Sequence, residues 1–381
     1  MPDDTRYCRF IRLVSKHHDD CQLMRVLCVT SGRGAITNVR PEAETFIGVR
    51  QLGAQVTVMT QRDSCYVSRM EAAGIEVLEL ETRCRLDPVA IRRIRATLKT
   101  GGYQILHAFN NKAITNGIVA VLGLPVRLVT YRGQTGNIHR YDPTAYLTHL
   151  NPRVDCVVCV ADSVRLDLIA NGLPASKAAT IYKGHSLAWY QAPPVSLGEL
   201  GIRWNSMVVG LVANARPRKG IPLFLRALRQ LPDDVCCDIL LVGAGMEVYK
   251  EAAIGLPKQV RIHFMGYRTD AAEVIAACRV SVLPALRREG LPKATIEAMA
   301  YGVTPLVTRT GGNAELVVDG ESGLVVEPGN ETALAEALTW LYRNPARCVE
   351  MGQNARERID QHFNIKDTVG RTFDLYQSLL R

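Results

Sequence analysis

The stretch Pro284-Ala-Leu-Arg-Arg-Glu-Gly-Leu-Pro-Lys-Ala-Thr-Ile-Glu-Ala-Met-Ala-Tyr-Gly302 follows the apolar run Val280–Leu283. The run predicts a buried strand. The residues from Pro292 onward predict a helix, because proline suits a first helical turn and Gly302 suits the position just beyond a last turn. A loop therefore delivers a helix N-terminus to the carboxyl end of a strand. The free amides and the dipole of such a helix end favour an anion, above all a phosphate.

Two carboxylates accompany this predicted phosphate site. Glu289 lies just before the helix, and Glu297 lies on it, roughly 1.5 turns in. Acidic side chains fit beside a phosphate if they accept hydrogen bonds from hydroxyl groups, and a sugar nucleotide presents both hydroxyls and phosphates. On spacing alone, a helix-terminal charge and an ordinary surface residue explain the pair equally well.

Strand-like runs alternate with helical stretches on both sides of a Pro- and Gly-containing segment. The runs are Met24–Thr30, Val56–Thr60, Glu76–Leu80, Ile105–Ala108, Arg127–Tyr131, Cys156–Val160 and Ala179–Tyr182, then Val208–Val212, Asp238–Val242, Arg261–Met265, Val280–Leu283, Val303–Thr308 and Gly323–Val326. Short β-rich runs separated by helices indicate parallel strands with crossovers. The fold class predicted is α/β, with two Rossmann-like doubly wound domains that face a cleft.

The same alternation predicts the domain boundaries. Residues 1–22 are expected to be a poorly ordered extension, and Met24 is a candidate for the true start. An N-terminal domain is expected over 23–188, a linker over 189–205 and a C-terminal domain over 206–365. A last helix over 366–381 is expected to pack back toward the N-terminal domain.

The segment quoted above closely resembles the family 4 glycosyltransferases, which have the GT-B fold. Their signature is E-G-[FL]-P-x-x-x-x-E-A-M-A-x-G, followed by a strand and a Gly-Gly loop. The matching residues are Glu289-Gly-Leu-Pro292, Glu297-Ala-Met-Ala300, Gly302 and Gly311-Gly312. The resemblance covers the second half of the chain and, more weakly, all of it. It implies a donor site in the C-terminal domain and an acceptor site in the N-terminal domain.

The resemblance implies a role for each matching residue. Glu289 would contact the transferred sugar, and Glu297 would contact the ribose. The diphosphate would be held by the backbone near Gly290, Leu291, Pro292 and Lys293. Gly243 and Gly245 would line the nucleotide, and the base would lie near Arg268.

The family also carries a basic pair after the first strand of this domain. The matching stretch is Val212-Ala-Asn-Ala-Arg-Pro-Arg-Lys-Gly220, in which Lys219 fits well. The family's arginine usually stands where Asn214 falls, so Arg216 or Arg218 would replace it. Two cations would stabilise a diphosphate leaving group without a metal. Because no Asp-x-Asp motif follows a strand, we expect neither a metal nor another cofactor.

The loop after the first strand is glycine-rich and is expected to face the cleft, and the stretch Arg40-Pro-Glu-Ala-Glu44 that follows is expected to open a helix. The loop contains Gly32, Arg33 and Gly34, and Arg33 or the nearby Arg40 would meet a phosphate or an acidic acceptor there. A dinucleotide fingerprint is not predicted, because Thr37 stands where a third glycine would be needed.

Two further side chains are candidates at the acceptor side of the cleft. Many family members carry a histidine after the strand Leu128–Tyr131, where this chain has Arg132. Arginine cannot act as a base near neutral pH, although it can bind a sugar or phosphate oxygen. His107, at the end of the run Ile105–Ala108, is the other candidate, with a structural histidine as the alternative interpretation.

Charge is distributed unevenly along the 381 residues. Residues 1–190 hold 24 Lys and Arg against 16 Asp and Glu, and the remainder holds 22 against 21. The basic half suggests an anionic partner such as a membrane surface, with a merely solvated set of arginines as the alternative. We expect no nucleic-acid partner and a cytoplasmic protein that is peripheral on the inner face of the cytoplasmic membrane.

The expected function is transfer of a sugar from a nucleoside-diphosphate sugar to a cell-envelope glycan or glycolipid, such as lipopolysaccharide. The family resemblance implies retention of anomeric configuration. The catalytic residues expected are Glu289, Arg216 and Lys219. The alternatives are a sugar-nucleotide epimerase of the same fold and a non-catalytic subunit that binds nucleotide sugars. An oxidoreductase is disfavoured by the incomplete glycine fingerprints.

Overall fold

The structure is a computed structural model that describes residues 23–34, 36–203 and 205–381. The extension predicted over residues 1–22 lies outside these described residues. The strands are β1 (Arg25–Val29), β2 (Gln55–Thr60), β3 (Glu76–Glu79), β4 (Ile105–Ala108), β5 (Arg127–Arg132), β6 (Cys156–Cys159), β7 (Ala178–Thr180), β8 (Met207–Val212), β9 (Cys237–Val242), β10 (Val260–Gly266), β11 (Val280–Leu283), β12 (Thr304–Thr308) and β13 (Leu324–Val326).

Helices connect these strands. The α-helices are α2 (Ile36–Gln51), α3 (Val67–Ala72), α4 (Pro88–Gly101), α5 (Asn111–Ala120), α6 (Asp162–Ala170), α7 (Ile221–Leu228), α8 (Ala271–Ala276), α9 (Lys293–Ala300), α10 (Asn313–Leu316), α11 (Glu331–Arg343), α12 (Pro345–His362) and α13 (Ile365–Leu380). The 3₁₀ helices are η1 (Pro143–Leu147), η2 (Ala175–Lys177), η3 (Leu187–Trp189), η4 (Pro217–Lys219), η5 (Met246–Tyr249) and η6 (Glu251–Ala253).

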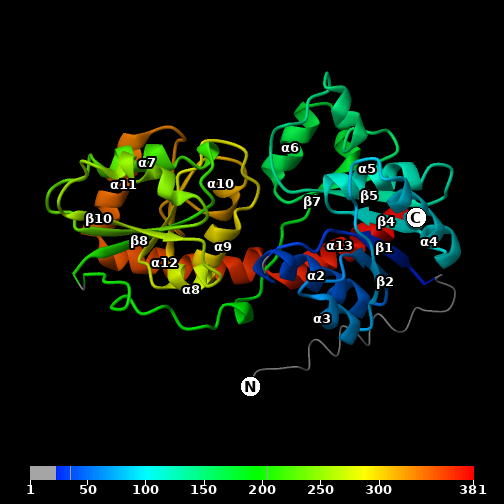
Figure 1. Cartoon of the computed structure of the whole chain (residues 1–381), viewed down its shortest axis with the longest axis horizontal. Helices are drawn as coiled ribbons and strands as arrows, with labels where there is room; N and C mark the ends of the chain where they lie inside the picture. The colour runs from blue at the N-terminus through cyan, green and yellow to red at the C-terminus, as the bar shows by residue number, and fades with distance from the viewer. Residues whose placement is uncertain (1–22, 35, 204) are drawn as a thin grey trace.

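The strands form two separate parallel sheets, so the predicted fold class is confirmed (Figure 1). The order is β3-β2-β1-β4-β5-β6-β7 in the first sheet and β10-β9-β8-β11-β12-β13 in the second. In each sheet the first strand in sequence pairs on one side with the second and on the other side with the fourth. The strand order therefore reverses at β1/β4 and at β8/β11, and such switch points are where open α/β sheets bind ligands.

Each sheet is covered by helices on both faces. In the N-terminal domain, α4, α5 and α6 pack on one face through Ile94, Ile114 and Leu168. On the other face, α2 and α13 contribute Phe46 and Tyr376. In the C-terminal domain, one face is covered by α7 and α11 and the other by α8 and α9. Parallel strands are apolar along their whole length because both faces are buried.

Two local predictions need correction. The first helix was expected to open at Arg40–Glu44, but α2 begins at Ile36 and holds Pro41 inside it. Proline removes one helical hydrogen bond, and burial of the face that includes Pro41 and Phe46 outweighs that loss. Pro292 is the N-cap of α9 rather than its first residue. Gly302 follows the helix with φ +76°, as expected.

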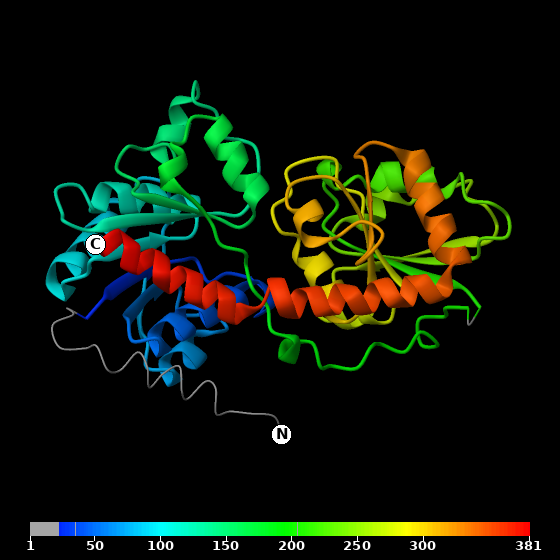
Figure 2. The same cartoon turned by 180° about the vertical axis from the view of Figure 1, so that it is seen from behind.

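The last two helices, α12 and α13, extend along both domains. Figure 2 shows α12 and α13 running one after the other across both domains. The chain also crosses between the domains at this place, where His185 N donates to Phe363 O at 2.8 Å and Ile365 N donates to His185 O at 3.0 Å. Helix α13 then packs on α2, with the Val369 side chain against Gly48.

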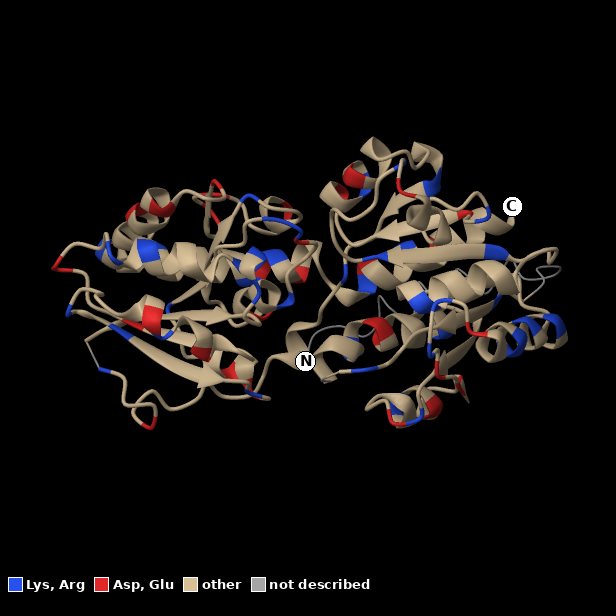
Figure 3. Ribbon diagram, turned by 45° about the horizontal axis from the view of Figure 1, so that its top comes forward, with Lys and Arg blue, Asp and Glu red and all other residues tan. Residues whose placement is uncertain are grey.

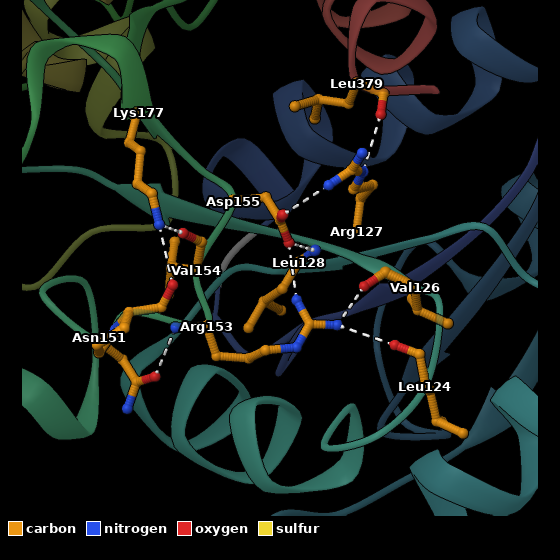
Figure 4. Close-up of polar contacts among 11 residues, drawn as sticks. Leu124, Val126, Arg127, Leu128, Asn151, Arg153, Val154, Asp155, Lys177 and Leu379 are labelled. Carbon is orange, nitrogen blue, oxygen red and sulfur yellow. Dashed lines mark hydrogen bonds and ion pairs between the residues drawn. The ribbon is translucent and has the colours of Figure 1, made fainter. Parts of the chain in front are cut away.

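The C-terminal end of α13 is held by an ionic network at the edge of β5 (Figure 4). Arg127 Nε donates to Leu379 O at 3.0 Å, and its NH1 group contacts Asp155 at 3.2 Å. Asp155 also accepts from Leu128 N at 2.8 Å and from Arg153 NH1 at 2.8 Å. The Asp155 carboxylate thus holds Arg127, the side chain that contacts the last helix, and joins β5 to the loop before β6.

Three histidines are buried as neutral groups. His107 bonds Tyr376 OH at 2.6 Å, His149 bonds Thr130 Oγ1 at 3.0 Å, and His185 bonds Tyr190 OH at 2.6 Å. Burial lowers the pKa of each imidazole to about 3.

We therefore expect acid to destabilise the protein. In the unfolded chain these histidines bind protons near pH 6.5, whereas in the folded chain they stay neutral until about pH 3. The free energy of unfolding therefore keeps its full value above pH 6.5 and falls as the pH is lowered toward 3. At pH 5 the loss is at most about 2 kcal/mol for each histidine. The urea midpoint of unfolding should be lower at pH 5 than at pH 7.5. An unchanged midpoint would contradict the burial of these histidines as neutral groups. The control is His139→Gln at an exposed position, which should show the same pH dependence as the unmodified chain.

Candidate active site

The two loops that leave the switch point of the second sheet pack on each other. One follows β8 and ends at Gly220, and the other follows β11 and begins at Pro284. Leu286 N donates to Arg218 O at 2.8 Å. A Cβ on Gly220 would lie 1.8 Å from Pro284 O, and its φ is +72°, so only glycine allows this approach. The basic loop and the glutamate loop are therefore one structural unit.

This unit pairs Glu289 with cations. The Glu289 side chain is 4% exposed, and Lys219 Nζ lies 2.8 Å from its Oε1 atom. Arg218 NH1 lies 3.8 Å from the same oxygen and donates to Arg288 O at 2.5 Å. A buried carboxylate requires such compensation. Of the two arginines that the sequence left open, Arg218 lies beside Glu289, whereas Arg216 lies on the exposed rim.

The second glutamate is paired by its neighbour on the helix. Glu297 is 3% exposed, and Lys293 Nζ lies 3.5 Å from its Oε1 atom. Burial raises the pKa of Glu297, and Lys293 opposes the rise. The same Lys293 Nζ donates to Thr37 Oγ1 of the N-terminal domain at 2.6 Å. This lysine therefore connects Glu297 to the opposite wall of the cleft.

Helix α9 offers free amides to the same space. Its N-cap, Pro292, makes no side-chain capping bond, and the first intrahelical bond runs from Ile296 N to Pro292 O. The amides of the first turn are thus unused within the helix and suit an anion.

A cavity of about 480 Å³ lies between the domains at this place, which is the size class of ligand sites. Predicted residues that line it are Arg216, Lys219, Gly243, Arg268, Pro292, Lys293 and Glu297. Predicted residues that are not among its lining are Glu289, Gly290, Leu291 and Gly245 and, in the N-terminal domain, Gly32, Arg33, Gly34, His107 and Arg132. Within the described ranges no cluster of three or more His, Cys, Asp or Glu could hold a metal.

The structure explains the positions of two of the lining residues, Gly243 and Arg268. A Cβ on Gly243 would lie 1.8 Å from Ala213 O, so this turn requires glycine for the loops after β8 and β9 to meet. Arg268 makes two hydrogen bonds to Asp270, with Nε to Oδ1 at 2.8 Å and NH2 to Oδ2 at 2.5 Å. Arg268 therefore lines the cavity while its charge is balanced and its side chain is held by Asp270.

The glycine-rich loop does not line this cavity, so its place in the cleft stays a prediction. Arg33 points to the carboxyl ends of β2 and β3, where it bonds Gln61 at 2.5 Å and Glu81 at 2.8 Å. Gly32 packs on Ser64 and Thr60 instead. Gly34, like Gly32, is absent from the cavity lining, which the following turn of α2 supplies.

Neither of the two polar candidates on the first sheet lines the cavity, and both are buried. His107 is 2% exposed and bonds Tyr376 of α13, so it serves the core. Arg132 is 7% exposed, and burial lowers the pKa of its guanidinium. Its NH2 group donates to Gly136 O within the same domain. Arg132 therefore shapes a loop rather than lining the donor cavity.

Sequence reasoning missed part of the N-terminal wall. Thr37, Arg40, Trp189 and Tyr190 line the cavity, and the Arg40 guanidinium lies 5.5 Å from the centroid of the Trp189 ring. Arg40 was considered for a phosphate. The aromatic pair lies in the segment taken as a linker, where periodicity carries no information about packing.

Comparison with known proteins places both halves of the chain in one family. The model described as "Glycosyl transferases group 1" matches residues 198–358, and the model described as "Glycosyltransferase Family 4" matches residues 46–189. Among curated relatives, N-acetyl-alpha-D-glucosaminyl L-malate synthase of Bacillus anthracis is 28% identical over 48% of each chain. The lipopolysaccharide core mannosyltransferase LpcC of Rhizobium leguminosarum is 26% identical over 73% of this chain and 79% of its own. The matched region spans about half the length of the first relative.

Solved structures agree over nearly the whole chain. HepE of Anabaena in complex with UDP has a TM-score of 0.74 at 20% identity, and the match covers 93% of this chain and all of HepE. A glycosyltransferase of Rickettsia africae has a TM-score of 0.78 at 17% identity, over 95% of this chain and all of its own. At this identity the likeness shows the fold. Because models of this family match both domains, the chain belongs to the family 4 glycosyltransferases and has the GT-B fold.

Proposed function

We propose that the chain transfers a sugar from a nucleoside-diphosphate sugar, with retention of configuration, to a cell-envelope glycan or glycolipid such as lipopolysaccharide. The observation that carries the proposal is the cavity at the switch point, which is lined by the α9 N-terminus, by the pair Lys293–Glu297 and by Lys219, whose partner Glu289 is buried beside it. The alternation of cation and carboxylate suits a ligand with both phosphates and hydroxyls. HepE of Anabaena was solved with UDP-glucose, which supports a donor of this class.

The proposed chemistry uses the chain's own groups. The first-turn amides of α9 hold the diphosphate, and Glu297 accepts hydrogen bonds from the ribose. Glu289 accepts them from the transferred sugar. As the bond between the anomeric carbon and the phosphate oxygen breaks, Lys219 and Arg218 stabilise the charge that builds on the diphosphate. The acceptor oxygen bonds to the anomeric carbon, and its proton passes to the leaving phosphate. This route needs neither a metal nor a base at Arg132.

The proposed acceptor is supported by relatives and by the surface. LpcC is named a lipopolysaccharide core mannosyltransferase, and WaaG, a solved structure with a TM-score of 0.63, is described as involved in lipopolysaccharide biosynthesis. In the part of the chain that the structure describes, no helix has the length and apolar character needed to cross a membrane. Helix α4 exposes Arg92, Arg93 and Val89, and Val89 is 63% exposed. Figure 3 marks the Lys and Arg positions of the chain in blue. We propose that this face of α4 meets an anionic membrane surface.

Substitution of Glu297 by Ala should weaken nucleotide binding about 10- to 100-fold, because charge-assisted hydrogen bonds to the ribose hydroxyls are lost. Calorimetric titration with UDP-, GDP- and ADP-sugars in metal-free buffer measures the change. Glu336→Ala, at an exposed position of α11, is the matched control and should bind normally.

Two results would count against the proposal. The donor site is wrong if the unmodified chain binds none of the three nucleotides, or if Glu297→Ala binds as tightly as the unmodified chain. Release of nucleotide only after a cell-envelope extract is added distinguishes a transferase from a binding subunit. Release without extract would instead favour hydrolysis or epimerisation.

A further inference from the structure

A loop of the N-terminal domain reaches the backbone of Glu289. This loop follows β5 and comprises residues 133–137. Thr135 donates twice to Glu289 O, from its backbone N at 3.4 Å and from its hydroxyl at 3.2 Å. The next residue, Gly290, lies so close to Gly133 O that a Cβ would be 2.0 Å from that oxygen. The position of the Glu289 carboxylate thus depends on a contact with the opposite domain.

The loop itself is fixed from two sides. Arg132 NH2 donates to Gly136 O, and Gly136 N donates to Asp167 Oδ2 at 2.7 Å. Gly136 and Asn137 have φ values of +75° and +62°, so the loop turns sharply between these two anchors. Arg132 therefore supports the loop that carries Thr135. Asp167 belongs to α6.

Helix α6 is in turn held by the C-terminal domain. Its N-cap residue is Ala161, which has no side chain able to cap the helix. The Glu315 carboxylate accepts from Asp162 N at 2.7 Å and from Ser163 N at 2.8 Å. It also accepts from Tyr182 OH at 3.0 Å. A carboxylate is favoured at a helix N-terminus by the free amides and the dipole.

Glu315 is well placed to serve the opposite domain. It lies on α10, directly after the Gly311-Gly312 loop, and Gly312 N donates to Gly290 O at 2.8 Å. Arg358 NH2 donates to Glu315 O at 2.7 Å, which fixes its backbone on α12. The loop that carries Glu315 therefore contacts the loop that carries Glu289 within one domain, and both bond to the other domain.

We propose that Thr135 and Glu315 are positioning residues that form an interdomain clasp and hold Glu289 in place for sugar transfer. The proposal rests on the proposed function. In it, the nucleotide binds to the C-terminal domain without the clasp, and closure of the two domains then seats Thr135 on the Glu289 carbonyl and Glu315 on α6. The acceptor domain thereby completes the sugar end of the donor site. Such closure around a ligand is a common domain motion.

The test uses Thr135→Val, Glu315→Gln and the double variant of the full chain. Solution X-ray scattering of the free proteins should show a larger radius of gyration for the double variant, because the domains open. Calorimetry with UDP, GDP and ADP should give affinities within about threefold of the unmodified chain, since the nucleotide contacts remain. With the donor that this panel selects, kcat should fall about 5- to 30-fold for each single variant while KM for the donor changes little.

Three controls make the outcome decisive. Thr135→Ser keeps the hydroxyl and should restore kcat, whereas a fold that is merely damaged would not be rescued. Thr339→Val and Glu336→Gln on α11 are matched substitutions and should leave all readouts unchanged. Unchanged scattering and unchanged kcat in the double variant would overturn the clasp. If no nucleotide binds to the unmodified chain, the proposed function fails, and scattering alone still decides whether the clasp closes the domains.

Discussion

Substitution of Lys219 by Ala should lower kcat for sugar transfer about 100- to 1000-fold, the effect of removing one group that stabilises charge in a transition state. Lys219 Nζ is the cation nearest to Glu289, at 2.8 Å, and it also lines the cavity in which the diphosphate would lie. Its loss removes the cation at the leaving group and leaves a buried carboxylate with only Arg218 nearby. Arg218 lies 1 Å farther from the carboxylate, at 3.8 Å, so compensation should be partial.

Initial rates of nucleotide release with donor and acceptor saturating measure this effect. Lys219→Arg should recover part of the rate, because it keeps the charge but changes its geometry. Lys258→Ala, at an exposed position of the same domain, is the control for loss of a positive charge. If Lys219→Ala raised only KM and left kcat unchanged, the lysine would contribute to ground-state binding and not to departure of the diphosphate.

The donor side of the site was predictable because its groups are close in sequence to the strands that place them. Lys219 and Glu289 stand on loops that follow β8 and β11, and parallel strands bring their carboxyl ends to one edge of a sheet. Each of these groups comes soon after a strand that is easy to recognise from its apolar residues. This holds for the helix end, the two glutamates and the basic loop. Only the choice between Arg216 and Arg218 needed the structure, because the 3₁₀ turn at 217–219 decides which arginine faces inward.

The candidates of the N-terminal domain were harder to place from the sequence, because the directions of their side chains depend on distant partners. Arg33 turns toward Glu81, which is 48 residues away, and His107 turns toward Tyr376, which is 269 residues away. No feature of the sequence near Arg33 or His107 indicates these partners. The start of α2 was misplaced for a similar reason, since a proline usually opens a helix, and only the packing of α2 under α13 reveals that Pro41 lies inside one.

Substitution of Gly290 by Ala should lower the transfer rate at least about 100-fold while nucleotide binding is retained, because misplacement by about 1 Å of groups far from a reacting centre has an effect of this size. The three closest atoms to a Cβ at this position all belong to the N-terminal domain: Gly133 O at 2.0 Å, Gly133 C at 2.9 Å and Val160 Cγ1 at 3.0 Å. The φ angle of Gly290 is not in the left-handed region. Alanine therefore fits the loop itself and is excluded only by the facing domain.

This geometry separates closure of the domains from the shape of the donor loop. If the loop needs glycine for its own sake, Gly290→Ala should weaken nucleotide binding and lower kcat together. If the domains must meet, calorimetry should show normal binding, solution scattering should show a more open molecule, and kcat alone should fall. Gly370→Ala on α13 is the control, because nothing lies within 4 Å of a Cβ there, its φ is not in the left-handed region and it does not line the cavity. A Gly290→Ala variant with normal kcat would mean that transfer proceeds without the contact between Gly290 and Gly133, and the closed arrangement would then have no part in positioning Glu289.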